Sequence, residues 1–378
     1  MLHPRLSMVL AATVAAGLAI STAPYASASA TSEAPGAVFV QTDDLASNSV
    51  IAYDRAADGH LTKAGTYLTG GAGAVVTGAV VDPLASQGSL TLDRTHHLLF
   101  AVNGGSDTLT VFGVDGSRLV RRQVLPTHGD LPVSVSVSGD LVYVLNARGG
   151  GSVSGYRIVG REVEPLSGST RTLNLTPNLN PEFLQTPSQV AIAPDASALV
   201  VATKTHGTLF VYPLADGVPA ASPTVTPSGT VPFALLFDRT HDLLVIDATG
   251  FATSYALGQD GSLAMVSKVG PTGQAAACWT VLVRGSLYAA NAGSSSISAF
   301  TDRHGVLSLI APVAAKTGAG PVDLAASGNG RFIYQLAGGS GQVDAYERAE
   351  DGSLTMLGSS GTGLGASVGK PLEGIAAS

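Results

Sequence analysis

Two histidines and two basic residues stand in polar loops of this 378-residue chain, where they could carry acid–base chemistry. His128 lies two positions before Asp130, and a nearby carboxylate can orient an imidazole that acts as a general base. His206 is a second candidate base. Arg148 and Lys204 each follow a β-rich run, and their charges could hold an anion or polarise a carbonyl oxygen. We therefore predict a catalytic acid–base site that contains these five residues, although loops also collect such residues without any chemistry.

Other kinds of site are excluded by residue type. Cys278 is the one cysteine, which rules out a disulfide framework and a cysteine-rich metal site. We expect it to be buried packing beside Trp279. His96 and His97 resemble half a metal site, but the same turn recurs at 238–241, which indicates a structural role. The sequence contains no calcium-loop pattern and no nucleophile elbow. We expect no cofactor and no metal ion.

Composition limits the class of protein. Apolar residues make up 45% of the chain, charged residues make up 12%, and there are 46 glycines. This balance excludes a disordered chain. Lys and Arg number 20 against 27 Asp and Glu, so the net charge is −7. A mildly acidic chain without a basic patch has no electrostatic footprint for nucleic acid.

The first thirty residues have the pattern of a secretory signal. Arg5 precedes an apolar run at residues 8–20, which is short for a membrane span. Ala-x-Ala sites follow at 26–28 and 28–30. We expect cleavage after Ala30 and an exported protein with no membrane span after processing. The alternative is a short N-terminal membrane anchor.

The rest of the chain is built from repeats. Seven β-rich runs are each followed by an alternating strand with one aromatic residue, spaced by 59, 44, 56, 43, 45 and 46 residues. The two long gaps contain insertions near 68–88 and 167–187. Without the insertions the period is about 45, which is typical of four-stranded propeller blades. The aromatic residues are Tyr53, Phe112, Tyr156, Tyr212, Tyr255, Phe300 and Tyr346.

These repeats predict an all-β fold, a seven-bladed β-propeller that spans residues 31–378. Asp-Gly or His-Gly turns precede the fourth strand of several units, as a tight hairpin requires. The first unit lacks its innermost strand, and the chain ends in LEGIAAS, which resembles that strand. We therefore expect residues 372–378 to pair with 37–42 and close the ring. Regular recurrence of the aromatics favours packing between blades over sugar stacking.

The repeat resembles a known family. The stretches PSQVAIAPDASALVVATK, RGSLYAANAGSSSISAF and GNGRFIYQLAGGSGQVDAYERAEDGSLTML are similar to the lactonase family of seven-bladed propellers, which includes propeller-type 6-phosphogluconolactonases and carboxymuconate cyclases. The resemblance implies a lactone hydrolase or a lactone-forming cyclase. In that family several inner strands open with His or Arg-His, whereas TPSQVA, VPFALL, ACWTVL and GPVDLA carry neither.

The propeller fold also predicts where a site would lie. Loops that enter each inner strand and loops that join the second and third strands form one mouth of the ring. The five candidate residues fall in such loops. Other polar residues map to the same mouth: Asp43, Asp44, Gln87, Glu182, Gln185, Asp247, Asp323 and Glu373.

Three functions remain open from the sequence. The first is a secreted hydrolase or cyclase of an extracellular, unphosphorylated lactone. The second is a non-catalytic propeller that binds a glycan, a peptide or a cell-wall partner, and the third is a structural surface protein. In each case we expect a monomer whose partner is a small molecule, a glycan or a peptide.

Overall fold

The computed structural model describes residues 1–2, 34–176, 181–363 and 372–378 of the protein. Contacts divide the chain into two units, Met1–Ser32 and Glu33–Ser378. Nearly all of the expected signal segment, residues 1–30, lies outside the described residues. Every described strand belongs to the second unit.

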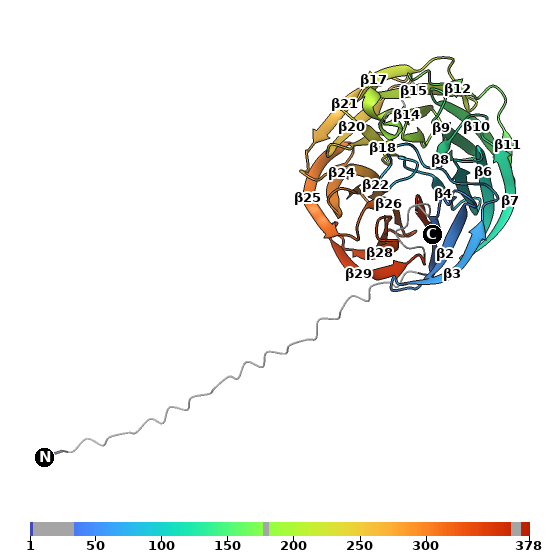
Figure 1. Cartoon of the computed structure of the whole chain (residues 1–378). Coiled ribbons are helices and arrows are strands. Elements are labelled where there is room, and N and C mark those ends of the chain that lie inside the picture. The colour runs from blue at the N-terminus through green and yellow to red at the C-terminus, as the bar shows by residue number, and fades with distance from the viewer. Residues whose placement is uncertain (3–33, 177–180, 364–371) are drawn as a thin grey trace. The chain divides into compact units, whose positions relative to one another are not determined.

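Seven antiparallel sheets follow one another around a ring in the second unit (Figure 1). Five of the sheets have four strands, and the outer position of the other two is divided between two short strands that pair with the same neighbour. The predicted all-β, seven-bladed propeller is therefore confirmed.

The strands of each blade follow one another from the ring axis outward. Blades 1 and 2 contain β30 (Ile375–Ala377), β1 (Gly36–Gln41), β2 (Ser49–Arg55) and β3 (Leu61–Leu68), then β4 (Leu90–Asp93), β5 (Leu98–Asn103), β6 (Thr108–Asp115) and β7 (Arg118–Pro126). Blade 3 contains β8 (Pro132–Ser138), β9 (Leu141–Asn146), β10 (Ser152–Val159), β11 (Glu162–Pro165) and β12 (Arg171–Thr172). Blade 4 contains β13 (Gln189–Ile192), β14 (Ala198–Ala202), β15 (Thr208–Ala215), β16 (Val218–Pro219) and β17 (Thr224–Pro227).

The last three blades have four strands each. Blade 5 contains β18 (Pro232–Phe237), β19 (Leu243–Asp247), β20 (Phe251–Leu257) and β21 (Leu263–Val269). Blade 6 contains β22 (Ala277–Val283), β23 (Ser286–Asn291), β24 (Ser296–Arg303) and β25 (Val306–Lys316). Blade 7 contains β26 (Pro321–Ala326), β27 (Phe332–Ala337), β28 (Gln342–Arg348) and β29 (Leu354–Gly361). The described helices are α1 (Glu182–Gln185) and the 3₁₀ turn η1 (Lys204–His206).

The Asp-Gly turns have the backbone that the sequence predicts. Gly59 has φ +89°, and a Cβ there would lie 2.6 Å from the ring of Phe332 in blade 7. Only glycine meets both the left-handed backbone and the close approach of the neighbouring blade. The turn therefore shapes its own hairpin and also lets two blades pack together.

The C-terminal strand closes the ring as predicted. β30 pairs with β1 in antiparallel register, with Val38 opposite Ala377 and Val40 opposite Ile375. Backbone hydrogen bonds extend this pairing in both directions, from Gln41 N–H to the Gly374 carbonyl and from Ser378 N–H to the Ala37 carbonyl. Blade 1 thus combines strands from both ends of the propeller.

The seven repeated aromatics pack between blades, as expected. Each is at most 3% exposed. Several of their hydroxyl groups also bond to the preceding blade. Tyr53 donates to the Gly361 carbonyl at the end of β29, Tyr156 donates to Pro126 at the end of β7, and Tyr346 donates to Lys316 at the end of β25. Burial and a directed hydrogen bond together set the angle between neighbouring blades.

One feature of the fold is absent from the sequence prediction. The insertion between blades 1 and 2 lies across one end of the ring axis, where residues 82–88 form what we call the plug. Trp279 Nε1–H of blade 6 donates to the Ser86 carbonyl (2.8 Å), and Ser86 Oγ donates to the Val133 carbonyl of blade 3 (2.8 Å). Gln87 N–H donates to the Ser188 carbonyl beside blade 4. The plug therefore ties together blades on different sides of the ring.

Candidate functional site

The five residues predicted from the sequence all lie at the plugged face of the ring. His128 and Asp130 are in the loop between β7 and β8, Arg148 follows β9, and Lys204 and His206 form η1 after β14. This is the face where the inner strands begin. The loops are therefore on the face that the repeat predicted, but the plug and the C-terminal segment occupy the axis there.

Arg148 is paired with a carboxylate. Its guanidinium donates to both carboxylate oxygens of Glu182, from Nε at 2.6 Å and from Nη2 at 3.1 Å. The hydrogen bond to Glu182 raises the pKa of Arg148, and the reciprocal bond lowers the pKa of Glu182. Thr77 N–H also donates to Glu182. Glu182 thereby fixes Arg148 and the first insertion to α1, beside a cavity of about 40 Å³.

His128 does not form the predicted pair with Asp130, and the second candidate base, His206, lies in a different loop. His128 is exposed, and its ring stacks at 6.5 Å on Tyr156, which packs blade 3 against blade 2. No hydrogen bond joins His128 to Asp130 among the described residues. The His206 ring lies 3.3 Å from the Thr203 carbonyl of its own turn. The structure brings Arg148 and Glu182 together but leaves both histidines outside that pair.

Lys204 is buried beneath the plug. It is 1% exposed, and its ammonium donates to the Ala85 carbonyl (2.8 Å) and to Thr186 Oγ1 (2.9 Å). Burial lowers the pKa of Lys204 to about 7, against the opposing effect of nearby Asp82. These contacts give Lys204 a structural role. The sequence did not show this role, because Lys204 follows a β-rich run, where an exposed loop residue is expected.

Three buried carboxyl groups lie in or near the plug: Asp82 within it, and Asp43 and Glu373 outside it. Asp82 accepts from the N–H groups of Ala85 (2.8 Å) and Ser86 (2.9 Å) and so holds the plug in a tight turn. Glu373 accepts from Leu84 N–H and from Ser86 Oγ, which joins the C-terminal segment to the plug. Burial raises the pKa of Asp82, and it raises the pKa values of Asp43 and Glu373 well above their usual range. Because neighbouring carboxylates repel one another, these groups stabilise the plug best when they are partly protonated.

A central channel of about 1620 Å³ runs from the plug to the opposite face. Its wall is made by the inner strands, and one end lies among the turns that follow those strands, including residues 238–241 of blade 5. None of the five predicted residues lines it. The channel has room for a substrate, whereas the cavity beside Arg148 is little larger than one water molecule.

Polar side chains gather where the channel meets the plug. Gln87 exchanges two hydrogen bonds with the backbone of Thr280 in blade 6, and Gln189 does the same with Leu235 in blade 5. Asp323 of β26 lines the channel near them. Its two carboxylate oxygens accept from Leu324 N–H (2.9 Å) and Ile375 N–H (3.3 Å).

Among the carboxyl groups of the channel, Asp323 has the environment best suited to acid–base chemistry. It is 5% exposed, and burial raises its pKa to about 7, against the lowering effect of its two backbone donors. A carboxyl that titrates near neutral pH beside a cavity can act as a general base and then as a general acid. The sequence placed Asp323 at the mouth but gave no reason to choose it, because the pKa depends on burial by the plug and by β30.

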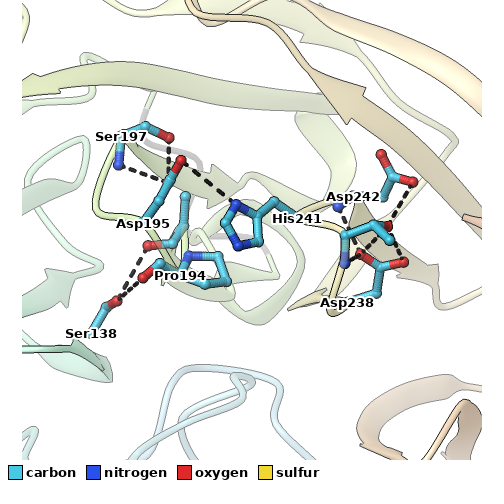
Figure 2. Close-up of polar contacts among 9 residues, drawn as sticks. Ser138, Pro194, Asp195, Ser197, Asp238, His241 and Asp242 are labelled. Atoms are coloured by element: carbon cyan, nitrogen blue, oxygen red, sulfur yellow. Dashed lines mark hydrogen bonds and ion pairs between the residues drawn. The ribbon is translucent and has the colours of Figure 1, made fainter. Parts of the chain in front are cut away.

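The turns at the open face are joined by histidine–carboxylate contacts. Figure 2 shows His241, from the β18–β19 turn, pointing toward Asp195 in the β13–β14 turn, with 3.6 Å between Nδ1 and Oδ2. His96 makes a similar link between blades 2 and 3, where its Nε2 lies 3.1 Å from Asp140. Its hydrogen bond with Asp93 raises the pKa of His96. The expected structural role of the His96 turn agrees with these contacts.

The described residues offer few alternatives to the channel. Cys278 is 7% exposed, as predicted for packing, and burial raises the pKa of its thiol. No group of three or more His, Cys, Asp and Glu side chains in the described ranges could hold a metal ion. Neither described helix has the length and hydropathy of a membrane span.

Known proteins resemble this chain in structure. No protein-family model matches the sequence, and no curated protein sequence matches it. A candidate 6-phosphogluconolactonase from Bacteroides fragilis is 16% identical, with a TM-score of 0.66 over 92% of this chain and 99% of that one. A Lactobacillus plantarum protein is 17% identical, with a TM-score of 0.69 over 91% and 99% of the two chains.

A third similar structure is the periplasmic gluconolactonase of Pseudomonas aeruginosa. It is 21% identical, with a TM-score of 0.63, and the match covers 86% of this chain and 96% of that one. At sequence identities this low, the structural match establishes the shared fold and no more. This chain is therefore a seven-bladed β-propeller with the fold of the lactonase-like proteins, as the resemblance in its repeats predicted.

Proposed function

We propose that the protein is an exported hydrolase of an unphosphorylated lactone, and that Asp323 acts at the plugged end of the central channel. The apolar run and Ala-x-Ala sites of residues 1–30 support export. The fold supports the lactonase class, since one similar structure is described as a periplasmic gluconolactonase. A phosphorylated sugar lactone is a cytosolic compound and would not meet an exported enzyme.

The observation that carries this proposal is the Asp323 carboxyl beside the cavity. Its pKa of about 7, raised by burial, makes a substantial fraction ionised at neutral pH while keeping it a stronger base than an ordinary aspartate. Each carboxylate oxygen of Asp323 has two lone pairs, and its backbone N–H donor uses only one of them. We propose that one of these oxygens takes the proton from a water molecule in the channel.

The reaction balances without a cofactor. The Asp323 carboxylate takes a proton from water as the water oxygen attacks the lactone carbonyl carbon. The ring C–O bond then breaks, and the departing alkoxide oxygen takes that proton back from Asp323. The product is an open-chain hydroxy acid.

Two glutamines can stabilise the developing oxyanion. The amide nitrogens of Gln87 and Gln189 carry two hydrogens each, and each nitrogen makes one hydrogen bond within the described residues, to Thr280 and to Leu235. The second N–H of either amide is a donor for the carbonyl oxygen. Because both side chains are held by a neighbouring blade, they would need little reorganisation during the reaction.

Hydrolysis of a lactone panel tests this function. Purified protein beginning at residue 31 is assayed by proton release against sugar lactones and aliphatic lactones, with Asp323→Asn prepared in parallel. We expect at least one lactone to be opened by the wild type and about 10²–10⁴-fold more slowly by the variant. Equal rates for the two proteins, or no hydrolysis of any lactone, would overturn the proposal.

A binding function without turnover is the second candidate. The inner-strand segments TPSQVA, VPFALL, ACWTVL and GPVDLA lack the His and Arg expected from the family resemblance. On this alternative the channel still binds a ligand, but Asp323→Asn changes only affinity.

The loop residues His128, Asp130, Arg148, Lys204 and His206 remain a sequence-based prediction for the hydrolytic site, and the cavity beside Arg148 has no room for a lactone.

A further inference from the structure

The open end of the channel carries an excess of positive charge. Four arginines line it, against two aspartates at the same end. This contrasts with the chain as a whole, which has a net charge of −7. The arginines come from three blades, 2, 5 and 6, and line one opening: Arg94, Arg239, Arg284 and Arg303.

The two aspartates offset only part of the charge of the four arginines. Asp238 accepts hydrogen bonds from Thr240 N–H and Asp242 N–H, both at 2.8 Å, and so serves its own turn (Figure 2). Burial raises the pKa of Asp302 to about 6, with a further contribution from the nearby Asp238. The mouth therefore keeps a positive balance at neutral pH.

The arginines are available to a ligand in different degrees. Arg94 Nη2 donates to the carbonyls of Ala326 (2.9 Å) and Ala377 (2.6 Å), which places its charge at the ends of β26 and β30. Arg239, Arg284 and Arg303 are exposed, and none of these three forms an ion pair with a carboxylate in the described part of the chain. Guanidinium groups of this kind suit a planar or tetrahedral anion.

Between this mouth and the plug, aliphatic side chains alternate with polar groups along the wall. The aliphatic side chains include Leu92, Val137, Leu236, Val281 and Leu324, one from each of five blades. A channel of about 1620 Å³ is larger than the roughly 300–1,000 Å³ typical of a small-molecule site. A simple sugar lactone would leave most of this wall uncovered, and uncovered apolar wall contributes no affinity.

We propose that the channel binds an amphipathic anion, with its apolar body along the wall and its anionic group at Arg239, Arg284 and Arg303. Resting on the proposed function, this names the substrate class: a lactone with an apolar substituent that carries an anionic group. The lactone ring then lies beside Asp323, and the anion lies at the mouth. The positive mouth also repels cationic ligands. Short, fully polar ligands bind weakly, because they have no apolar body to pack against the wall.

A pair of fluorescent probes tests the proposal directly. 8-Anilinonaphthalene-1-sulfonate and N-phenyl-1-naphthylamine have the same apolar body, but only the first carries an anion. We expect wild-type protein to bind the sulfonate at least about tenfold more tightly, a difference of about 1.4 kcal/mol, because guanidinium groups donate charge-assisted hydrogen bonds to it. Decanoate should displace the sulfonate, and butyrate should not.

Variants locate the anion. The triple variant Arg239→Gln, Arg284→Gln, Arg303→Gln should lose about tenfold or more in affinity for the sulfonate and keep its affinity for the uncharged probe. The matched control replaces three exposed arginines away from the channel, Arg118, Arg122 and Arg161, and should bind both probes as wild type does. Circular dichroism spectra and melting temperatures confirm that both variants are folded.

The outcomes separate this inference from the proposed function. Equal affinity for the two probes, or an unchanged sulfonate affinity in the triple variant, overturns the inference whether or not a lactone is hydrolysed. Asp323→Asn should keep arginine-dependent probe binding while it loses hydrolysis. If the probes behave as expected but no lactone is opened, the ligand class holds and the hydrolase proposal fails.

Discussion

Burial of the Asp323 carboxyl has consequences for both catalysis and stability. The carboxyl lies between two backbone donors and the channel, and its pKa is raised to about 7 by burial. An ordinary aspartate titrates near 3.9. The same environment that makes a useful base therefore also makes the ionised group unfavourable in the folded protein.

The activity of the protein should follow the ionisation of Asp323. We expect kcat/KM for an accepted lactone to rise as pH increases through about 7, because the general base must be deprotonated. A pH–rate profile between pH 5 and 9 measures this. A profile that is flat across this range would show that another group acts as the base.

Stability should change with pH in the opposite sense. Because the folded pKa of Asp323 is raised above its unfolded value, its contribution is fully present below about pH 4 and is lost as pH rises through about 7. The free energy of unfolding of wild type relative to Asp323→Asn should thus fall by up to about 4 kcal/mol between pH 4 and pH 9. Urea unfolding at several pH values measures it, and a constant difference would refute the buried titration.

Lys204 should matter for stability more than for chemistry. Replacing it with Met leaves two buried acceptors, the Ala85 carbonyl and Thr186 Oγ1, without their donor. Each unsatisfied group costs about 1–3 kcal/mol. We expect Lys204→Met to lower the free energy of unfolding by several kcal/mol and Lys316→Met, on an exposed side chain, to leave it within about 0.5 kcal/mol. Equal stability of the two variants would contradict the role assigned to Lys204.

At the level of elements, the plug and β30 jointly determine which end of the channel is open. The plug contacts blades 3 and 6 through Ser86, and Glu373 joins it to the C-terminal segment. β30 supplies Ile375, whose N–H bonds to Asp323. The position of the proposed site therefore depends on two segments that are far apart in sequence.

Removal of residues 372–378 should destabilise the whole ring. Blade 1 would lose its inner strand, β1 would expose an unpaired edge, and the plug would lose Glu373. We expect the truncated protein to melt at a clearly lower temperature, or not to fold, in differential scanning calorimetry. The full chain from residue 31 is the reference. An unchanged melting temperature would show that β30 is dispensable.

The sequence predicted the elements well because strands and hairpin turns leave local signals. Alternating apolar residues, Asp-Gly turns and one aromatic in each unit were sufficient for seven blades and for the pairing of 372–378 with 37–42. The path of residues 82–88 had no such signal. It depends on long-range contacts such as Trp279 with Ser86 and Lys204 with Ala85, and neither is visible in local spacing.

At the level of the whole molecule, the plug changes the interpretation of every polar loop. The predicted site residues were selected because their loops surround one mouth of the ring. His128 and Arg148 do lie at that face, but the channel opens at the other one, and its closed end contains Asp323. Burial and pKa follow from the packed ring, so the sequence could place Asp323 at the axis and could not single it out.

The exported form should begin near residue 31. The strands of the seven described blades lie between Gly36 and Ala377, so removal of residues 1–30 should leave the propeller intact. Mass spectrometry of protein recovered from the medium or the cell exterior should find Thr31 as the first residue, or Ser29 if the earlier Ala-x-Ala site is used. An intact Met1 on exported protein would contradict cleavage and favour the membrane-anchor alternative.

The most direct measurement compares Asp323→Asn with His128→Ala in the hydrolysis of one accepted lactone at pH 8. If the channel is the site, Asp323→Asn loses about 10²–10⁴-fold in kcat/KM, and His128→Ala, on an exposed ring at the plugged face, stays within about twofold of wild type. His97→Ala, in the β4–β5 turn, should also retain activity. A large loss in His128→Ala together with full activity in Asp323→Asn would place the chemistry in the loops of the plugged face and contradict the channel site.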